Sequence, residues 1–458
     1  KRANYGLRGI YTFVCYPYGG KYFGGHKMAQ IEIKNLTFFY PDMEKGEYLE
    51  NPALCNINLE IHRGEFMVIC GQTGCGKSTL LRTIKPTICP NGKITGNVLY
   101  NGINIKDLKE RQQAEKIGFV MQNPDNQIVT DKVWHELAFG LENLGLKSEE
   151  IRQKTAEIAE YFELTDLYYL KPDKLSGGQK QLLNLAAVMT MNPEILLLDE
   201  PTSQLDPIAT EKFVSMLKKI NEDLGVTIIM SEHRLSFVLD MADKLVVMNN
   251  GKIMEWGNPL EIADKIKNQK ISKLMPYATR VYYECGKKGT PPVSIKDGRK
   301  WLERELQDKE PPTDWSDRKG DSSKGKFIQE NHKEADINKK EMAITCKNLW
   351  FRYEKYERDI IKGLYFSVKR GEIFAILGGN GTGKSTTMWL LSGVKKPYRG
   401  KITKKGKVAL LPQSMQNIFS RDKVSKELEG CENSLIEEME IQDILNRHPY
   451  DISGGQQQ

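Results

Sequence analysis

Short, unbroken runs of hydrophobic residues recur along this chain, each bounded by polar or glycine-rich segments. Residues 66–70 form one such run, and residues 373–377 form another. Continuous apolar runs of this kind are typical of buried strands in a parallel sheet. Each run is followed by a glycine-rich stretch and then by a segment that predicts the first turn of a helix. The pattern therefore predicts two α/β units with the order strand, loop and helix.

The two predicted units share a second feature. Residues 31–36 and 343–349 open the units with similar strand-like patterns, and a tyrosine follows at matching places, Tyr40 and Tyr353. Landmarks that recur in one order indicate an internal duplication. The second copy is shorter between Lys384 and its Ser-Gly-Gly-Gln segment, which predicts a trimmed antiparallel edge and a trimmed helical subdomain.

The glycine-rich loops at residues 71–78 and 378–385 both fit the pattern Gly-x-x-x-x-Gly-Lys-Ser/Thr. Glycines let consecutive backbone N–H groups turn toward phosphate oxygens, the lysine neutralises the outer phosphates, and the hydroxyl reaches Mg²⁺. We therefore expect ATP or a similar triphosphate, with Mg²⁺, at each loop. The residues expected to bind it are Gly71, Gly74, Gly76, Lys77, Ser78 and Thr79 in the first loop, and Gly378, Gly381, Gly383, Lys384, Ser385 and Thr386 in the second.

Two carboxylates stand at the end of another apolar run, at residues 195–198. Adjacent residues at a strand end point to different sides. Asp199 can therefore hold the Mg²⁺ shell while Glu200 faces the outer phosphate and an attacking water. Two acids after a strand can also cap a helix, but the phosphate loop in the same unit favours the catalytic interpretation.

Composition and charge narrow the class of protein. The 458 residues suffice for two or three domains, and 39% hydrophobic with 28% charged residues is typical of globular proteins. No apolar run approaches the length of a membrane span. Eight cysteines without a Cys-x-x-Cys pair indicate neither a zinc site nor a disulfide framework, and we infer a reducing cytoplasm. Because the net charge of +7 is spread among acidic residues, we expect a solvated basic surface and no nucleic acid.

The chain divides into four segments. The first has no strand or helix period, and we expect a disordered or non-native extension, with Met28 as the natural start. The third is rich in Lys, Glu and Pro, as a linker would be, although a short helix near residues 298–306 is compatible with its sequence. The expected segments are an extension at residues 1–27, a first unit at 28–275, a linker at 276–340 and a second, C-terminally incomplete unit at 341–458.

Further motifs lie between and after these features in a fixed order. They are a Ser-Gly-Gly-Gln segment, an aspartate after Pro-Thr-Ser-Gln-Leu, and a histidine after an apolar run: Ser176, Gly177, Gly178, Gln179, Asp206 and His233. With this order the chain resembles the ATP-binding cassette (ABC) ATPase family, over about residues 31–271 and from residue 341 onward. The resemblance implies a P-loop NTPase fold, a RecA-like core with an antiparallel β subdomain and a helical subdomain, duplicated as two cassettes. In that family two cassettes pair head to tail, within one chain or between chains, and sandwich ATP.

The resemblance also implies roles for single residues. Glu200 would be the general base, His233 would contact the γ-phosphate, and Gln122 would sense metal and water. A lone histidine is more often structural, and a tyrosine before proline often lies in a turn. The remaining implied residues are Tyr40 and Tyr353 on adenine, Asp206 between the two sites, Ser453, Gly454, Gly455 and Gln456 as the second Ser-Gly-Gly-Gln, and Ser78, Gln122, Asp199, Ser385 and Gln413 near the metal.

One segment points to a branch of the family. Residues 121–146 resemble the glutamine-loop region of ATPases from energy-coupling factor (ECF) transporters, importers of vitamins and of cobalt or nickel ions. Val133, Leu137, Leu141 and Leu144 fall at helical spacing, and in that family the region helps to receive the membrane T component. The alternative for this stripe is ordinary packing of the helical subdomain. The resemblance implies a peripheral protein at the cytoplasmic face of the membrane, with a T component and a substrate-binding membrane subunit as partners.

Other cassette ATPases are alternatives. A soluble twin-cassette protein of the ABC-F type, which acts on ribosomes, also joins two cassettes by a charged linker, but the proline pairs here disfavour a long helical hairpin. A DNA-repair cassette ATPase would carry zinc-type cysteine pairs and a coiled-coil insertion, and neither is visible.

The second copy departs from the family pattern. It has no counterpart of Asp199, Glu200, Asp206 or His233, because the sequence stops at its Ser-Gly-Gly-Gln. The composite site with Lys77 is formally complete, whereas the site with Lys384 lacks a base. We therefore expect ATP binding in the first cassette and poor hydrolysis by the chain as written.

Overall fold

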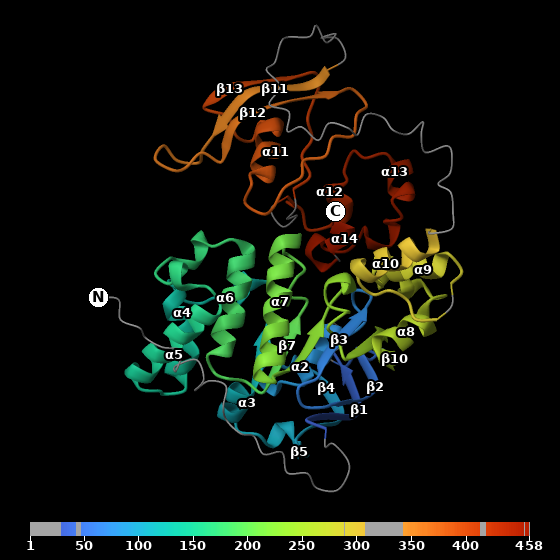
Figure 1. The fold of residues 1–458 in the computed structure, drawn as a ribbon. Helices are drawn as coiled ribbons and strands as arrows, with labels where there is room; N and C mark the ends of the chain where they lie inside the picture. The colour runs from blue at the N-terminus through green and yellow to red at the C-terminus, as the bar shows by residue number, and fades with distance from the viewer. Residues whose placement is uncertain are drawn as a thin grey trace. The chain divides into compact units, whose positions relative to one another are not determined.

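The computed structural model describes residues 29–42, 47–287, 289–306, 342–412, 418–452 and 454–457. The chain separates into two compact units, residues 1–324 and 325–458 (Figure 1). The predicted extension at residues 1–27 lies outside the described residues, as do most of the residues that join the units.

The first unit is built on two sheets. The larger has the strand order β10-β9-β3-β8-β7-β6, in which only β10 is antiparallel to its neighbour. Its strands are β3 (Phe66–Gly71), β6 (Ile117–Val120), β7 (Ile195–Asp199), β8 (Thr227–Ser231), β9 (Lys244–Asn249) and β10 (Lys252–Gly257). The smaller is antiparallel, in the order β2-β1-β4-β5, with β1 (Ile31–Phe39), β2 (Leu54–Ile61), β4 (Lys93–Tyr100) and β5 (Ile103–Asn104).

Two hydrophobic cores cover the larger sheet. Alternate residues of β3 enter opposite cores, because successive side chains of a strand point to opposite faces. Helix α2 lies in the core shared with the smaller sheet, whereas α6 and α7 contribute to the other. The helices are α2 (Lys77–Thr83), α3 (Glu110–Lys116), α4 (Val133–Asn143), α5 (Ser148–Tyr161), α6 (Gly177–Met189), α7 (Pro207–Leu224), α8 (Pro259–Ile266), α9 (Tyr277–Glu284) and α10 (Ile295–Leu306).

These elements confirm the predicted P-loop α/β fold, with an antiparallel sheet and a helical region of α4, α5 and α6 beside the parallel core (Figure 1). None of the described helices combines the length and the apolar character needed to cross a bilayer.

The start of the predicted linker is folded. Helices α9 and α10 occupy residues 277–306 and contact each other, with the rings of Tyr282 and Trp301 5.2 Å apart. An ion pair of 2.5 Å between Lys287 Nζ and Glu305 Oε2 ties the two helices further. The composition of residues 276–340 as a whole, with proline pairs and many charged residues, pointed to a linker, and the short helix that its sequence allowed near residues 298–306 is formed as part of α10.

The second unit repeats part of the first. A three-stranded antiparallel sheet has the order β12-β11-β13, with β11 (Met342–Phe351), β12 (Ile361–Lys369) and β13 (Arg399–Lys404). Helix α11 (Lys384–Ser392) packs against this sheet through Leu390 and Leu391. Three short helices follow: α12 (Val424–Glu427), α13 (Asn433–Glu438) and α14 (Gly454–Gln457).

The strand predicted at residues 373–377 is not formed, and this prediction was wrong. Ile373 is 99% exposed and Leu377 is 90% exposed. In the first unit, β3 is hydrogen-bonded on both sides, to β8 and β9, and the described part of the second unit contains no counterpart of either. An apolar run cannot form a buried parallel strand without flanking strands to pair with its backbone.

Candidate active site

The first phosphate loop connects β3 to α2, and its glycines leave room for close backbone approach. Gly76 has φ 101°, and a Cβ there would lie 2.5 Å from the carbonyl oxygen of Ala53. A Cβ on Gly71 would lie 2.4 Å from the carbonyl oxygen of Met248. Both positions therefore require glycine, and the loop keeps the open backbone that a phosphate cradle needs.

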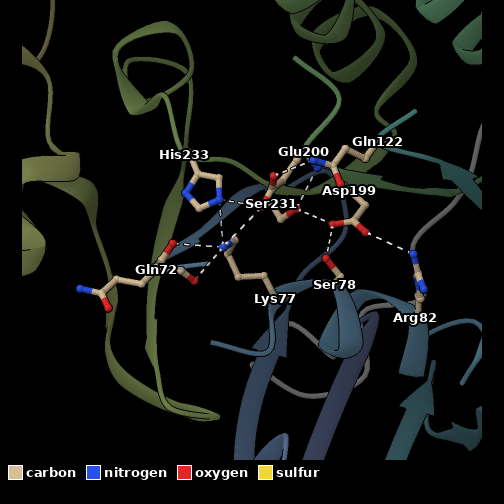
Figure 2. A network of polar contacts seen from close by, with 10 residues as sticks. Gln72, Lys77, Ser78, Arg82, Gln122, Asp199, Glu200, Ser231 and His233 are labelled. Atoms are coloured by element: carbon tan, nitrogen blue, oxygen red, sulfur yellow. Dashed lines mark hydrogen bonds and ion pairs between the residues drawn. The ribbon is translucent and has the colours of Figure 1, made fainter. Parts of the chain in front are cut away.

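Lys77 is the first residue of α2 and is only 4% exposed. Its Nζ donates hydrogen bonds to the carbonyl oxygens of Gly71 at 3.0 Å and Gln72 at 3.2 Å. The same atom lies 3.5 Å from Glu200 Oε1 and 3.4 Å from His233 Nε2 (Figure 2). The ammonium thus lies at the centre of the predicted catalytic groups, where it can neutralise phosphate oxygens.

Glu200 follows β7 and contacts two of the predicted residues. Its Oε1 lies 2.8 Å from His233 Nε2, and its Oε2 accepts a hydrogen bond of 3.1 Å from Gln122 Nε2. Burial raises the pKa of Glu200, but the hydrogen bond and charge of His233, together with the Lys77 charge, outweigh burial and lower the pKa. The carboxylate is therefore ionised at neutral pH, as a general base has to be.

Asp199 and Ser78 form the metal side of the site. Ser78 Oγ donates to Asp199 Oδ1 at 2.8 Å, and Asp199 is 2% exposed. Arg82 reaches the other carboxylate oxygen at 3.8 Å. A hydroxyl and a carboxylate are oxygen ligands of the kind that Mg²⁺ prefers, so these two residues fit Mg²⁺. The bound ion would offset the charge of phosphate oxygens.

The two tyrosines expected to stack on adenine occupy equivalent positions in the two units. Tyr40 Oη lies 3.0 Å from Thr79 Oγ1, and Tyr353 Oη lies 3.2 Å from Thr386 Oγ1. Each hydrogen bond places an aromatic ring beside the helix that starts at the phosphate loop. This repeated contact supports the duplication, and the stacking of the two rings on adenine stays a prediction.

Ser176 begins α6 as its N-cap. Its Oγ accepts from the backbone N–H of Gln179 at 3.3 Å, and the Gln179 side chain accepts from the Ser176 N–H at 2.9 Å. This capping box leaves the first backbone N–H groups of the helix pointing outward. A Cβ on Gly178 would lie 2.7 Å from the Ala209 side chain, so the close approach of α6 and α7 requires glycine there.

The structure does not bring all the predicted site residues of the first unit together. None of the polar contacts found for Lys77, Ser78 and Glu200 comes from the Ser176 motif of the same unit. Asp206 is the N-cap of α7 and accepts from the N–H of Ala209 at 2.8 Å. Its expected role between two sites remains a proposal.

In the second phosphate loop, as in the first, the lysine side chain donates hydrogen bonds to carbonyl oxygens of its own loop. Lys384 Nζ donates to the carbonyl oxygens of Gly378 at 2.9 Å and Gly379 at 2.6 Å. In the described part of the second unit, no carboxylate forms an ion pair with Lys384. Gln413 and Ser453 lie outside the described residues, and Gly454, Gly455 and Gln456 lie in α14.

Sequence reasoning missed several polar residues of the first site. Ser231 Oγ donates to Asp199 Oδ1 at 2.9 Å and accepts from the Glu200 N–H at 2.9 Å. Thr202 donates its hydroxyl to Glu232, which is 2% exposed, and burial raises the pKa of Glu232 to about 7. The sequence did contain a signal for Ser231, because this residue ends the apolar run that forms β8. In the structure, Ser231 pairs in register with Asp199 of β7.

The fold and this site define a P-loop protein that binds a nucleoside triphosphate with Mg²⁺ and can hydrolyse it. A family model described as "ABC transporter" matches residues 54–203 and 361–458, more than half of the chain. The chain belongs to the ABC transporter family of ATP-binding proteins, as its sequence motifs predicted. ATP and Mg²⁺ are therefore its cofactors, and ATP hydrolysis is its reaction.

Relatives of the chain match over most of its length. A "Putative ABC transporter ATP-binding protein" of Bacillus thuringiensis subsp. konkukian is 38% identical over 457 residues, covering 94% of this chain and 78% of the relative. A protein of the same description from Methanosarcina acetivorans is 30% identical over 475 residues, covering 93% of this chain and 73% of its own. Among solved structures, cbiO1 from Clostridium perfringens, part of the ABC transporter complex cbiONQ, shows 29% identity with a TM-score of 0.46, covering 54% of this chain and 98% of cbiO1.

Proposed function

We propose that this chain is the ATP-hydrolysing subunit of an ECF-type importer of vitamins or of cobalt or nickel ions. Its partners would be a membrane T component and a substrate-binding membrane subunit, and it would act at the cytoplasmic face of the cell membrane. The observation that supports this proposal is a hydrogen-bonded segment that runs from the catalytic carboxylate to an exposed apolar surface beside α4.

The segment begins at Gln122, whose side chain donates to Glu200. Helix α6, which starts at the Ser-Gly-Gly-Gln motif, holds the segment at two points. Gln181 donates to the carbonyl oxygen of Met121 at 3.0 Å, and Asn184 donates to that of Pro124 at 3.1 Å. The loop beside the site is therefore fixed to the helix that carries the signature motif, so a movement of one shifts the other.

The same segment is fixed to α4 at its other end. Glu136, which is 5% exposed, accepts from the backbone N–H groups of Val129 and Thr130 at 3.1 and 2.9 Å. The Thr130 hydroxyl also donates to this carboxylate at 2.8 Å. Three hydrogen bonds to one buried carboxylate make this a rigid junction.

The stripe predicted from helical spacing is not the docking surface. Val133, Leu137 and Leu141 are at most 1% exposed and are buried, as the packing alternative had it, whereas Leu144 follows the end of α4 and is half-buried. The exposed apolar residues lie around them instead. We call Val129, Phe139, Tyr169 and Leu170 the α4 surface; they are 64%, 42%, 79% and 43% exposed.

Backbone hydrogen bonds fix part of this surface to α4. The N–H groups of Val133 and Trp134 donate to the carbonyl oxygens of Leu170 and Tyr168, both at 3.0 Å. Exposed apolar groups held on rigid elements beside a catalytic loop fit a site that receives an amphipathic helix of a partner.

In the proposed cycle, ATP draws two cassettes together. Lys77, Glu200 and His233 would face a Ser-Gly-Gly-Gln motif from the other cassette, within the chain or from a second copy. Tyr40 and Tyr353 would stack on adenine, Asp206 would connect the sites, and Gln122 and Gln413 would respond to the metal. Closure would move the α4 surfaces with the T component, and hydrolysis would reset the pair.

Co-expression with a candidate T component tests the proposal. We expect the double variant Val129→Asp/Tyr169→Asp to lose copurification with the T component while it retains MgATP. Ile103→Asp, at a 54% exposed apolar residue of β5, is the matched control and should still copurify. Copurification of the unaltered chain with ribosomes instead of membranes would refute the importer assignment and favour the ABC-F alternative.

A further inference from the structure

The antiparallel sheets of the two units are the same element in two copies, which allows a comparison position by position. Ile33 in β1 and Cys346 in β11 occupy the same register position. Each is buried against a hydrophobic core and pairs with a hydrophobic residue on both flanking strands. The next residue along each strand therefore points to the outer face of its sheet.

Four outer positions differ strongly in charge between the copies. In the first unit, Glu32 pairs with Glu60, and Lys34 pairs with Asn97. In the second unit, the corresponding pairs are Thr345 with Ser367 and Lys347 with Lys401. These four positions carry a net charge of −1 in the first sheet and +2 in the second.

Among these four positions, the lysine of the first sheet is paired with a carboxylate, and the two lysines of the second sheet are not. Lys34 Nζ lies 2.8 Å from Glu32 Oε1. Lys347 and Lys401 instead face each other across β11 and β13, and neither forms an ion pair with a described residue. Like charges directly opposite in a sheet are destabilising. An anionic partner laid on this face would remove that repulsion.

The surroundings extend the positive charge. No Asp or Glu occurs between residues 373 and 421, and two exposed lysines, Lys405 and Lys407, follow directly after β13. Tyr365, also on the outer side of the sheet, is 52% exposed. In the β11–β12 connection, Asp359 already has partners: Arg352 lies 3.8 Å from it, and the Tyr398 hydroxyl donates to it at 2.8 Å.

We propose that this basic sheet face, formed by Lys347, Tyr365 and Lys401 with Lys405 and Lys407 just beyond the end of β13, binds an anionic phospholipid surface. The inference rests on the proposed location of the protein at a membrane. Lysines are hydrated point charges without the bidentate geometry of arginine, and here they are spread over a sheet face. Such an arrangement suits a diffuse layer of negative head groups, with an exposed tyrosine at the interface.

Sedimentation of the full chain with protein-free vesicles tests the proposal. The vesicles contain phosphatidylcholine with about 30% phosphatidylglycerol, or phosphatidylcholine alone, since each cation near an anionic surface contributes on the order of 1 kcal/mol. The variant Thr345→Glu/Ser367→Glu/Lys401→Asn installs the residues of the first sheet and lowers the charge by three. We expect it to bind anionic vesicles about 100-fold more weakly, because each charge is worth about fivefold.

Two further variants serve as controls. Lys34→Asn removes a lysine at the position equivalent to Lys347 and should leave vesicle binding within about twofold, because that lysine is already paired. The reverse exchange, Glu32→Thr/Glu60→Ser/Asn97→Lys, should strengthen binding. All installed residues already occur at the same register in the other copy, so thermal unfolding should show that each variant folds.

Equal binding of the unaltered chain to both vesicle types, or unchanged binding of the triple variant, would overturn the proposal. Competition by single-stranded RNA at concentrations below those of the lipid would assign the face to nucleic acid instead and would also overturn it. The vesicles contain no T component. Failure of the importer assignment therefore leaves the vesicle result intact, and failure of vesicle binding leaves copurification with a T component intact.

Discussion

His233 Nε2 lies 2.8 Å from Glu200 Oε1, and the two residues come from the ends of neighbouring parallel strands. Glu200 has φ 44°, a left-handed conformation that is unusual for a residue with a side chain. Lys77 Nζ lies 3.5 Å from the same oxygen, Glu200 Oε1. Together these contacts place one ionised carboxylate between two groups that can carry positive charge.

Replacing Glu200 by Gln should separate binding from hydrolysis. The amide keeps the shape of the side chain but cannot accept a proton, so we expect MgATP to be retained and the hydrolysis rate to fall by about 10²- to 10⁴-fold. Single-turnover hydrolysis and nucleotide retention measure the two quantities. Glu222→Gln, at an exposed position of α7, should change neither. Unimpaired hydrolysis by the Glu200 variant would assign the base to another residue.

The two phosphate-loop lysines give a matched pair of variants. Lys77→Ala removes a buried charge that is surrounded by two carbonyl oxygens, Glu200 and His233, and should abolish MgATP binding at the first loop. Lys384→Ala should leave the first-loop affinity unchanged, because its described contacts lie within the second unit. Equilibrium binding of a fluorescent ATP analogue, with thermal unfolding as the folding check, measures both. Equal affinity of the Lys77 variant and the unaltered chain would contradict the site.

Much of the site could be predicted because its signals are local. The glycines around Lys77 and the acids after residues 195–198 are fixed by the chemistry of a short segment, and each lies where the sequence placed it. The predictions that failed depend on which segments of the fold lie next to each other, and a local stretch of sequence does not show this. Residues 373–377 have the composition of a buried strand, but strand formation depends on partners elsewhere in the fold.

The helical stripe shows the same limit in a different form. Helical spacing identified which residues of α4 share a face, and the structure confirms that Val133, Leu137 and Leu141 do so. Spacing cannot tell whether such a face meets the core of the same chain or a partner. In this structure α4 packs against α5 and α6, so this face of α4 is buried in the core of the first unit.

Ser231 was not predicted, and its removal should affect both carboxylates. The variant Ser231→Ala removes a donor to the Asp199 carboxylate and one of two acceptors of the Glu200 N–H, which keeps the carbonyl oxygen of Ser231 at 3.2 Å. A hydrogen bond to a charged group contributes about 1.5–3 kcal/mol, so we expect a destabilised first unit and weaker Mg²⁺ dependence of ATP binding. Ser231→Thr keeps the hydroxyl and is the control. Magnesium titration of ATP binding and thermal unfolding measure the two effects, and normal values for both would show that the hydroxyl is dispensable.

Glu232 should make the stability of the first unit depend on pH. Burial raises its pKa to about 7 from the ordinary value of 4.5, and the negative charge of Glu200 adds to the rise, against the hydrogen bond from Thr202 and the charges of His233 and Arg234. Between these two values the folded protein holds a proton that the unfolded chain has released. Its contribution to stability is therefore complete below about pH 4.5 and is lost as the pH rises through about 7.

The loss amounts to about 3 kcal/mol, because one unit of pKa corresponds to about 1.4 kcal/mol. Other groups also contribute to the pH dependence of stability, so the comparison has to be made with Glu232→Gln, which keeps the size of the side chain and stays neutral. We expect the free energy of unfolding of the unaltered chain, relative to this variant, to fall between pH 5 and pH 7.5. Denaturant unfolding at both pH values measures it, and Glu222→Gln, an exposed exchange of the same kind, should show no such difference. A pH-independent difference between the unaltered chain and Glu232→Gln would mean that Glu232 is already ionised when buried, with Thr202 and Arg234 compensating its charge.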